Sequence, residues 1–162
     1  MTDCTPTQQK HRRRLPVFRS FACEDSSEEV AESRHLEIAG VSSSTEINEL
    51  EALFLSFGHV QGIDTYHQAI GQVTVTYYDS RDALRAKTWL GSTYTVKSVE
   101  GPEEPELCDK LQLLNNSNYT SVEVKRVFGI FGDISKFQVS GPHIEVRYFD
   151  LRVAAKVRHS LL

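Results

Sequence analysis

The chain contains an internal repeat, which restricts its possible folds more than any other feature of the sequence. The segment "VTVTYYDSRDALRAK", which begins at Val73, is echoed by "IEVRYFDLRVAAKV", which begins at Ile144. Upstream, "ELEALFLSFGHV" from Glu49 is answered by "EVKRVFGIFGDI" from Glu123, in the same order and with a slightly different offset. Such a repeat indicates a duplicated structural unit with a change of loop length inside it.

Both copies show alternating and helical periodicities in the same order. In the first copy these periodicities predict strands at 35–40, 59–66, 71–78 and 94–99, with helices at 42–58 and 80–90. In the second copy they predict strands at 110–115, 133–139 and 143–149, with helices at 121–132 and 150–161. The order is βαββαβ in the first copy, and the second copy lacks the last strand.

Composition shifts divide the chain into four parts. Residues 1–33 mix a basic cluster with an acidic stretch and have no apolar period, which predicts a disordered leader. The two units are expected at 34–99 and 107–162, and the acidic, proline-bearing segment 100–106 is interpreted as a linker. The second unit, without its fourth strand, is expected to be incomplete.

Charge and cysteine content exclude several classes of protein. Although the net charge is −4, residues 34–100 carry five Lys/Arg against eight Asp/Glu, whereas 107–162 carry eight against five. Cys4, Cys23 and Cys108 have no spacing that suits a zinc site or a disulfide framework. No apolar run is long enough to span a bilayer. We therefore expect an intracellular protein, in the nucleus or the cytoplasm, with no membrane contact.

No motif in the sequence indicates an enzyme. There is no Gly-rich phosphate loop, no GxSxG and no HExxH, so we expect no catalytic residues, metal, cofactor or small-molecule substrate. Asp79 with Arg81, and Asp150 with Arg152, are interpreted as helix-capping aspartates followed by solvated arginines. Further capping signals are the Ser/Thr run before the first helix and a capping box at Thr120 and Glu123, the latter before the helix at 121–132.

The order of elements resembles the RNA-recognition motif. "LFLSFGHV" closes the first helix and "YYDSRDALRA" runs from the third strand into the second helix, as in that motif. Two copies in tandem resemble the first two motifs of the Mei-two-like (meiosis-regulator) RNA-binding proteins of plants and fungi, on the cues "VTYYDSRDALRA", "VRYFDLRVAA" and "VFGIFGDI". The resemblance covers roughly 34–162 and implies an α+β fold of two ferredoxin-like units, each with its helices on one face of an antiparallel sheet.

In that motif, aromatic rings on the open sheet face stack against RNA bases. Aligning the motif with the first unit places Glu37, Gln72 and Thr74 at these positions, and none of them is aromatic. In the second unit the corresponding residues include Gln112, His143 and Glu145, of which only His143 can stack. The aromatic residues that the motif keeps for its core are Tyr77 and Tyr148.

Two functional hypotheses follow from the sequence. The first is binding of single-stranded RNA, with His143 stacking, Arg147 beside it, contacts from Gln72, Thr74 and Gln112, and phosphate partners Lys110, Lys136, Arg12, Arg13 and Arg14. For each Lys and Arg the competing interpretation is a solvated surface charge. The second hypothesis is a protein-interaction or scaffold module on the same fold, with Leu114, Trp89 and Leu84 as apolar contacts.

Overall fold

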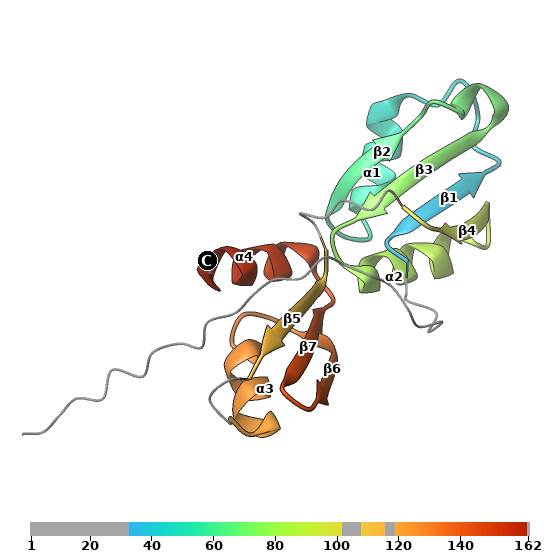
Figure 1. The fold of residues 1–162 in the computed structure, drawn as a ribbon. Coiled ribbons are helices and arrows are strands. Elements are labelled where there is room, and N and C mark those ends of the chain that lie inside the picture. Colours follow the sequence, from blue (N-terminus) through green and yellow to red (C-terminus); the bar gives the residue numbers. More distant parts are fainter. Residues whose placement is uncertain (1–32, 102–107, 116–118, 162) are drawn as a thin grey trace, which may run out of the picture.

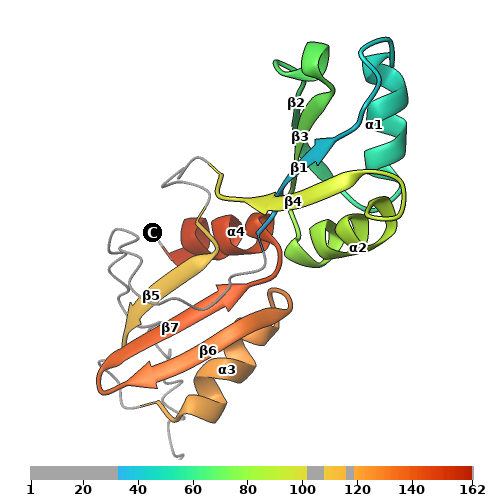
Figure 2. The same ribbon diagram turned by 90° about the vertical axis from the view of Figure 1, so that its right-hand side faces the viewer.

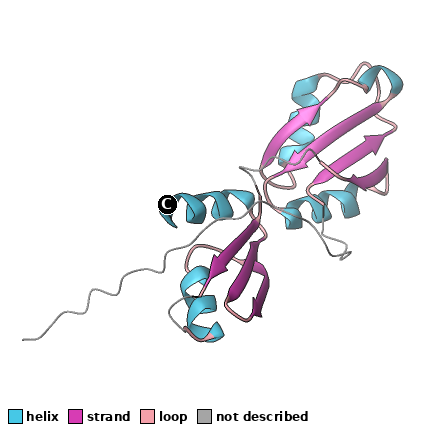
Figure 3. Cartoon of the chain, in the orientation of Figure 1, coloured by secondary structure: helices cyan, strands magenta, loops and turns pink. Residues whose placement is uncertain are grey.

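The computed structural model describes residues 33–101, 108–115 and 119–161, which form two α+β units in the predicted order of elements (Figure 1). Both units contain strands and helices that are joined by loops (Figure 3). The predicted leader, apart from Ser33, and most of the predicted linker lie outside the described residues. The exact domain limits therefore stay a prediction.

The first unit is a four-stranded antiparallel sheet with the strand order β2-β3-β1-β4. Helices α1 and α2 pack on one side of this sheet, and the other side is open (Figure 2). A short 3-10 turn lies between β2 and β3. The elements are β1 (His35–Ala39), α1 (Ile47–Leu55), β2 (Val60–Asp64), η1 (Gln68–Ile70), β3 (Gln72–Tyr77), α2 (Ser80–Leu90) and β4 (Thr95–Val99).

The second unit is a three-stranded antiparallel sheet with the strand order β5-β7-β6. Strands β5, β7 and β6 correspond to β1, β3 and β2 of the first unit and lie in the same order. Within the described part of the chain, the second unit has no strand that corresponds to β4. The ferredoxin-like arrangement predicted for both units is therefore confirmed. The elements are β5 (Lys110–Leu114), α3 (Ser121–Gly129), β6 (Ile134–Ser140), β7 (His143–Tyr148) and α4 (Leu151–Leu161).

Each unit has its own hydrophobic core, and the two cores share no residue. Tyr77 and Tyr148 occupy equivalent places in them, both with 0% of their surface exposed. The Tyr77 hydroxyl donates to the carbonyl of Phe54 at 3.0 Å, and the Tyr148 hydroxyl donates to that of Phe128 at 2.8 Å. Burial raises the pKa of both phenols, so they are neutral hydrogen-bond donors. Their predicted place in the core is confirmed.

The predicted capping signals are confirmed at three helices and wrong at a fourth. Asp150 accepts the backbone N–H of Arg152 at 2.8 Å at the start of α4. Thr120 and Glu123 form the complete capping box of α3, and Asp79 accepts the backbone N–H of Arg81 at the start of α2. Helix α1 instead begins after Glu46, and no side chain caps it. The Ser42 hydroxyl of the preceding run bonds to another serine, so local hydrogen bonding in the loop replaces the expected cap.

Candidate nucleic-acid interface

The open face of the first sheet is polar, and its central strands β1 and β3 carry no Phe, Tyr or Trp there. Burial alternates along β1 and β3, so that the residues between the core positions lie on the open face. Across this face Glu37 of β1 pairs with Thr74 of β3 and with Lys97 of β4. Asp64 of β2 lies opposite Thr74. One row of the face therefore contains two carboxylates and a single lysine, which does not favour a polyanion.

The open face of the second sheet has the opposite charge. Arg147 of β7 pairs with Lys110 of β5 on one side and with Lys136 of β6 on the other. We call these three residues the cation row. Because cross-strand partners on one face lie about 4.5–5.5 Å apart at their Cβ atoms, three positive side chains cross the sheet side by side.

Glu145 lies on the same face and orders part of the cation row. Its carboxylate contacts the Lys110 ammonium at 3.4 Å and the Arg147 Nε at 2.9 Å. Burial alone would raise the pKa of Glu145, but the hydrogen bonds and charges of Arg147 and Lys110 outweigh it and lower that pKa. The glutamate is therefore ionised at neutral pH. Among the described residues of this face, three cations stand against one carboxylate, so these residues carry an excess of positive charge.

Polar groups suited to bases occupy the other end of this face. His143 begins β7, is exposed, and pairs with Leu114 of β5 and with Ser140 of β6. In the neighbouring row, amide side chains at Gln112 and Gln138 flank Glu145. An imidazole ring and two amides can offer one stacking surface and several hydrogen bonds to base edges.

The structure brings together only part of the predicted site. Five predicted residues share the open face of the second sheet: Lys110, Gln112, Lys136, His143 and Arg147. Gln72 and Thr74 lie half-buried on the open face of the first sheet. The predicted phosphate partners Arg12, Arg13 and Arg14 lie outside the described residues.

Sequence reasoning missed an exposed aromatic residue in the loop between β2 and β3. The sequence pattern assigns Tyr66 to a strand, yet β2 ends at Asp64, whose carboxylate accepts the backbone N–H of Tyr66 at 2.8 Å. Tyr66 is 84% exposed, and its ring packs edge-on against the His67 ring, with 4.9 Å between the ring centroids. The signal that could have found it is the aspartate two residues earlier, because Asp at this spacing forms a turn with its own backbone.

Within the described ranges, no group of three or more His, Cys, Asp or Glu side chains could hold a metal ion. Among the helices that the structure describes, none has the length and apolar character required to cross a membrane.

Sequence comparison finds relatives among plant proteins. The chain is 27% identical to Protein MEI2-like 4 of Oryza sativa subsp. japonica over 144 residues, which cover 80% of this chain and 14% of the relative. It is 29% identical to Protein MEI2-like 1 of Arabidopsis thaliana over 138 residues, which cover 76% of this chain and 15% of the relative. The chain thus spans only a small part of the length of these curated relatives. No protein-family model matches the chain.

Several solved structures align over most of the chain. The Sex-lethal RNA recognition domains 1 and 2 from Drosophila melanogaster align at 20% identity and a TM-score of 0.34, covering 80% of this chain and 94% of that chain. The C. elegans NONO-1 homodimer aligns at 13% identity and a TM-score of 0.41, covering 82% of this chain and 58% of that chain.

Proposed function

The chain is a relative of the MEI2-like proteins across both of its units, and from this premise we propose that it binds single-stranded RNA. The observation that carries the proposal is the cation row on the open face of the second sheet. The second unit is the place where the sequence has its basic bias and where the structure aligns the charges in one row. RNA would therefore bind first to this sheet.

The cation row suits a phosphate backbone better than it suits the bases. Neutralising phosphates with Lys and Arg releases condensed counterions, which supplies sequence-independent affinity and makes binding salt-dependent. Because Glu145 already holds Lys110 and Arg147, an RNA phosphate competes with this carboxylate for both of them. We therefore expect the affinity for RNA to be modest.

Base contacts would come from the other end of the same face. His143 is exposed there and is the one predicted stacking residue. A base stacked on a ring contributes about 1–3 kcal/mol. Gln112 and, on the first sheet, Gln72 and Thr74 can add hydrogen bonds to bases or sugars, with less effect on affinity.

Titration of fluorescent single-stranded RNA at several salt concentrations tests the proposal. The logarithm of the association constant should fall linearly with the logarithm of salt concentration, with a slope of about −0.7 per phosphate contact. Lys136→Gln should make this slope shallower by about 0.7, because one contact is lost. His143→Ala should weaken binding about 5- to 150-fold and leave the slope unchanged. Lys125→Gln is the matched control, because Lys125 is exposed on α3, behind the sheet.

Two results would contradict the proposed mode of binding. If affinity does not depend on salt, phosphate contacts do not lead the interaction. If Lys125→Gln weakens binding as much as Lys136→Gln does, the RNA does not lie on the open face.

A protein-interaction module remains the second candidate, and one observation favours it. Trp89 and Leu84 on α2 are 70% and 48% exposed, although large apolar side chains are usually covered. A protein partner retained after nuclease treatment, and lost with Trp89→Ala, would support this candidate. Loss of the partner on nuclease treatment would support RNA as the link.

An intracellular location, in the nucleus or the cytoplasm, is part of the same proposal. Fluorescence microscopy of a tagged full-length protein tests it directly, and a signal confined to the cell exterior would contradict it.

A further inference from the structure

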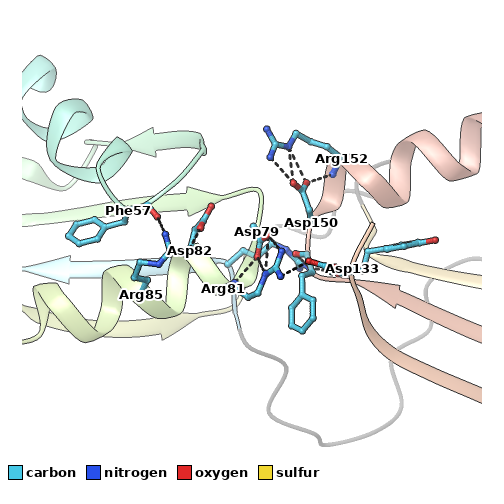
Figure 4. A network of polar contacts seen from close by, with 11 residues as sticks. Phe57, Asp79, Arg81, Asp82, Arg85, Asp133, Asp150 and Arg152 are labelled. Carbon is cyan, nitrogen blue, oxygen red and sulfur yellow. Dashed lines mark hydrogen bonds and ion pairs between the residues drawn. The ribbon is translucent and has the colours of Figure 1, made fainter. Parts of the chain in front are cut away.

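The two units are joined by the ends of their equivalent strands β3 and β7. An isolated antiparallel bridge pairs Asp79 with Asp150, which directly follow the repeated "YY" and "YF" pairs of the sequence (Figure 4). The two hydrogen bonds of this bridge are reciprocal: the Ser80 N–H donates to the Phe149 carbonyl at 3.2 Å, and the Leu151 N–H donates to the Tyr78 carbonyl at 3.0 Å. Equivalent residues of the repeat thus face each other across an approximate twofold axis.

Arginine side chains repeat this symmetry. The Arg81 guanidinium lies over the Phe149 ring of the other unit, with its Cζ 4.6 Å from the ring centroid. The Arg152 guanidinium lies over the Tyr78 ring, with its Cζ at 4.9 Å. A cation within about 6 Å of a ring centroid is attracted by the negative face of the ring. The prediction that these arginines are solvated is confirmed, because their side chains are 44% and 45% exposed, but it did not include their contact with the opposite unit.

The two aspartates hold these arginines in place. Asp79 contacts the Arg81 guanidinium at 2.7 Å, and Asp150 contacts that of Arg152 at 2.6 Å. Burial alone would raise the pKa of both carboxyls, but hydrogen bonds from the side chain and backbone of the adjacent arginine outweigh burial and lower each pKa. Each aspartate is therefore ionised, caps its own helix and orients its own arginine toward the other unit.

A third contact joins the starts of the equivalent strands β1 and β5. The Arg34 carbonyl accepts the Tyr77 N–H, and the Asp109 carbonyl accepts the Tyr148 N–H, so Arg34 and Asp109 occupy equivalent positions. Across the junction, Arg34 Nη2 contacts the Asp109 carboxylate at 3.2 Å and donates to the carbonyl of Phe149 at 3.2 Å. The Arg34 side chain is only 14% exposed. Its removal would leave a shielded carboxylate without this partner.

We propose that residues 78–81 and 149–152, with Arg34 and Asp109, form an interaction surface whose partner is the other repeat of the same chain. We call this surface the clasp. It holds the two units in one orientation in the free protein, before any RNA is bound. Only residues 100–109 separate β4 from β5, so the short connection gives the two halves a high effective concentration for each other. This inference stands independently of RNA binding.

Backbone NMR relaxation on the full chain tests the clasp, because it measures how fast each unit tumbles. In the wild-type protein both units should show one common rotational correlation time. The double variant Arg81→Ala/Arg152→Ala should show two shorter correlation times, one for each unit. Arg85→Ala is the matched control, because Arg85 lies on the same helix but bonds within the first unit, to the Phe57 carbonyl at 2.9 Å and to Asp82 at 3.4 Å (Figure 4).

The outcomes separate clearly. Common tumbling in the wild-type protein and in Arg85→Ala, with independent tumbling in the double variant, supports the clasp. Independent tumbling in the wild-type protein overturns the clasp without any variant, so a variant that fails to fold does not block the test. Common tumbling that persists in a folded double variant also overturns it. The clasp is also overturned if its contacts form between two copies of the chain in a dimer. Light scattering at several protein concentrations would reveal such a dimer.

Discussion

Among the described residues, only one of the two stacked arginines of the clasp, Arg81, forms an ion pair with the opposite unit, which leads to a specific prediction. Arg81 Nη1 contacts the Asp133 carboxylate of the other unit at 2.8 Å. The equivalent of Asp133 in the first unit is His59, because the His59 carbonyl accepts the Tyr78 N–H at 3.1 Å and the Asp133 carbonyl accepts the Phe149 N–H at 3.2 Å. The variant His59→Asp should therefore place a carboxylate near Arg152 and complete the symmetry of the clasp.

The expected gain follows from the exposure of the existing pair. The side chains of Arg81 and Asp133 are 44% and 73% exposed, so their ion pair is a surface interaction. Exposed pairs contribute about 0.2–1 kcal/mol in double-mutant cycles. His59→Asp should raise the free energy of unfolding by a similar amount. The same free energy corresponds to a rise of about 1.4- to 5-fold in the ratio of molecules whose units are joined by the clasp to molecules whose units are separated.

Urea unfolding followed by circular dichroism measures the gain, in a cycle of His59→Asp with Arg152→Ala. The gain should appear when Arg152 is present and vanish when the same change is made together with Arg152→Ala. His59→Asn is the control, because it matches Asp in shape without the charge. The gain should also shrink at about 1 M salt, where the screening length falls to about 3 Å. If His59→Asp stabilises both backgrounds equally, the added carboxylate does not act through Arg152, and the reasoning from symmetry is refuted.

Three further predictions concern a hydrogen bond in the core, the effect of acid on the clasp and the effect of RNA length on binding. Tyr148→Phe removes a hydrogen bond to the buried carbonyl of Phe128 and should lower the free energy of unfolding by about 0.5–1.5 kcal/mol, measured by urea denaturation; no change would show that this bond is not stabilising. Asp79 and Asp150 have lowered pKa values in the folded protein. Their ionised carboxylates therefore contribute fully to stability above about pH 3.9, the ordinary pKa of Asp, and this contribution is lost as the pH falls through their pKa values in the folded protein. The common correlation time should therefore split on acidification, and a clasp unchanged after both carboxyls have titrated, followed by their NMR shifts, would contradict this. Finally, the double variant Arg81→Ala/Arg152→Ala should bind RNA long enough to reach both sheets more weakly than the wild-type protein does, because preorganisation is lost, while short RNA binds equally well. Equal losses for both lengths, in fluorescence titrations, would contradict that reasoning.

The order of elements and the composition of both cores could be predicted from the sequence. Period-two alternation in "QVTVTY" and "HIEVRY" predicts which side of each strand faces the core, and Tyr77 and Tyr148 lie there. The capping box at Thr120 and Glu123 was also predictable, because both of its partners lie within one turn of the helix. These features depend on spacings of two to four residues, which a sequence displays directly.

The functional face was predictable only in part. Alternation places Lys110, Lys136 and Arg147 on one side of their strands, but their alignment in a single row depends on strand register. The partnership of Glu145 with Lys110 likewise depends on which strands are neighbours. The sequence alone therefore does not distinguish a Lys or Arg of this row from a solvated surface charge, because the difference depends on how the strands pair.

The repeat itself, with its strands, helices and core positions, was determined by the sequence, because local periodicity encodes which side of each element is buried. The roles of Arg81 and Arg152 were decided only by the tertiary structure. Both follow a capping aspartate, and their local pattern predicts a helix start with a solvated charge. The two rings that they contact, and the Asp133 carboxylate that Arg81 contacts, belong to residues about 50 to 75 positions away in the sequence. No short-range pattern specifies which distant segment will lie beside these arginines.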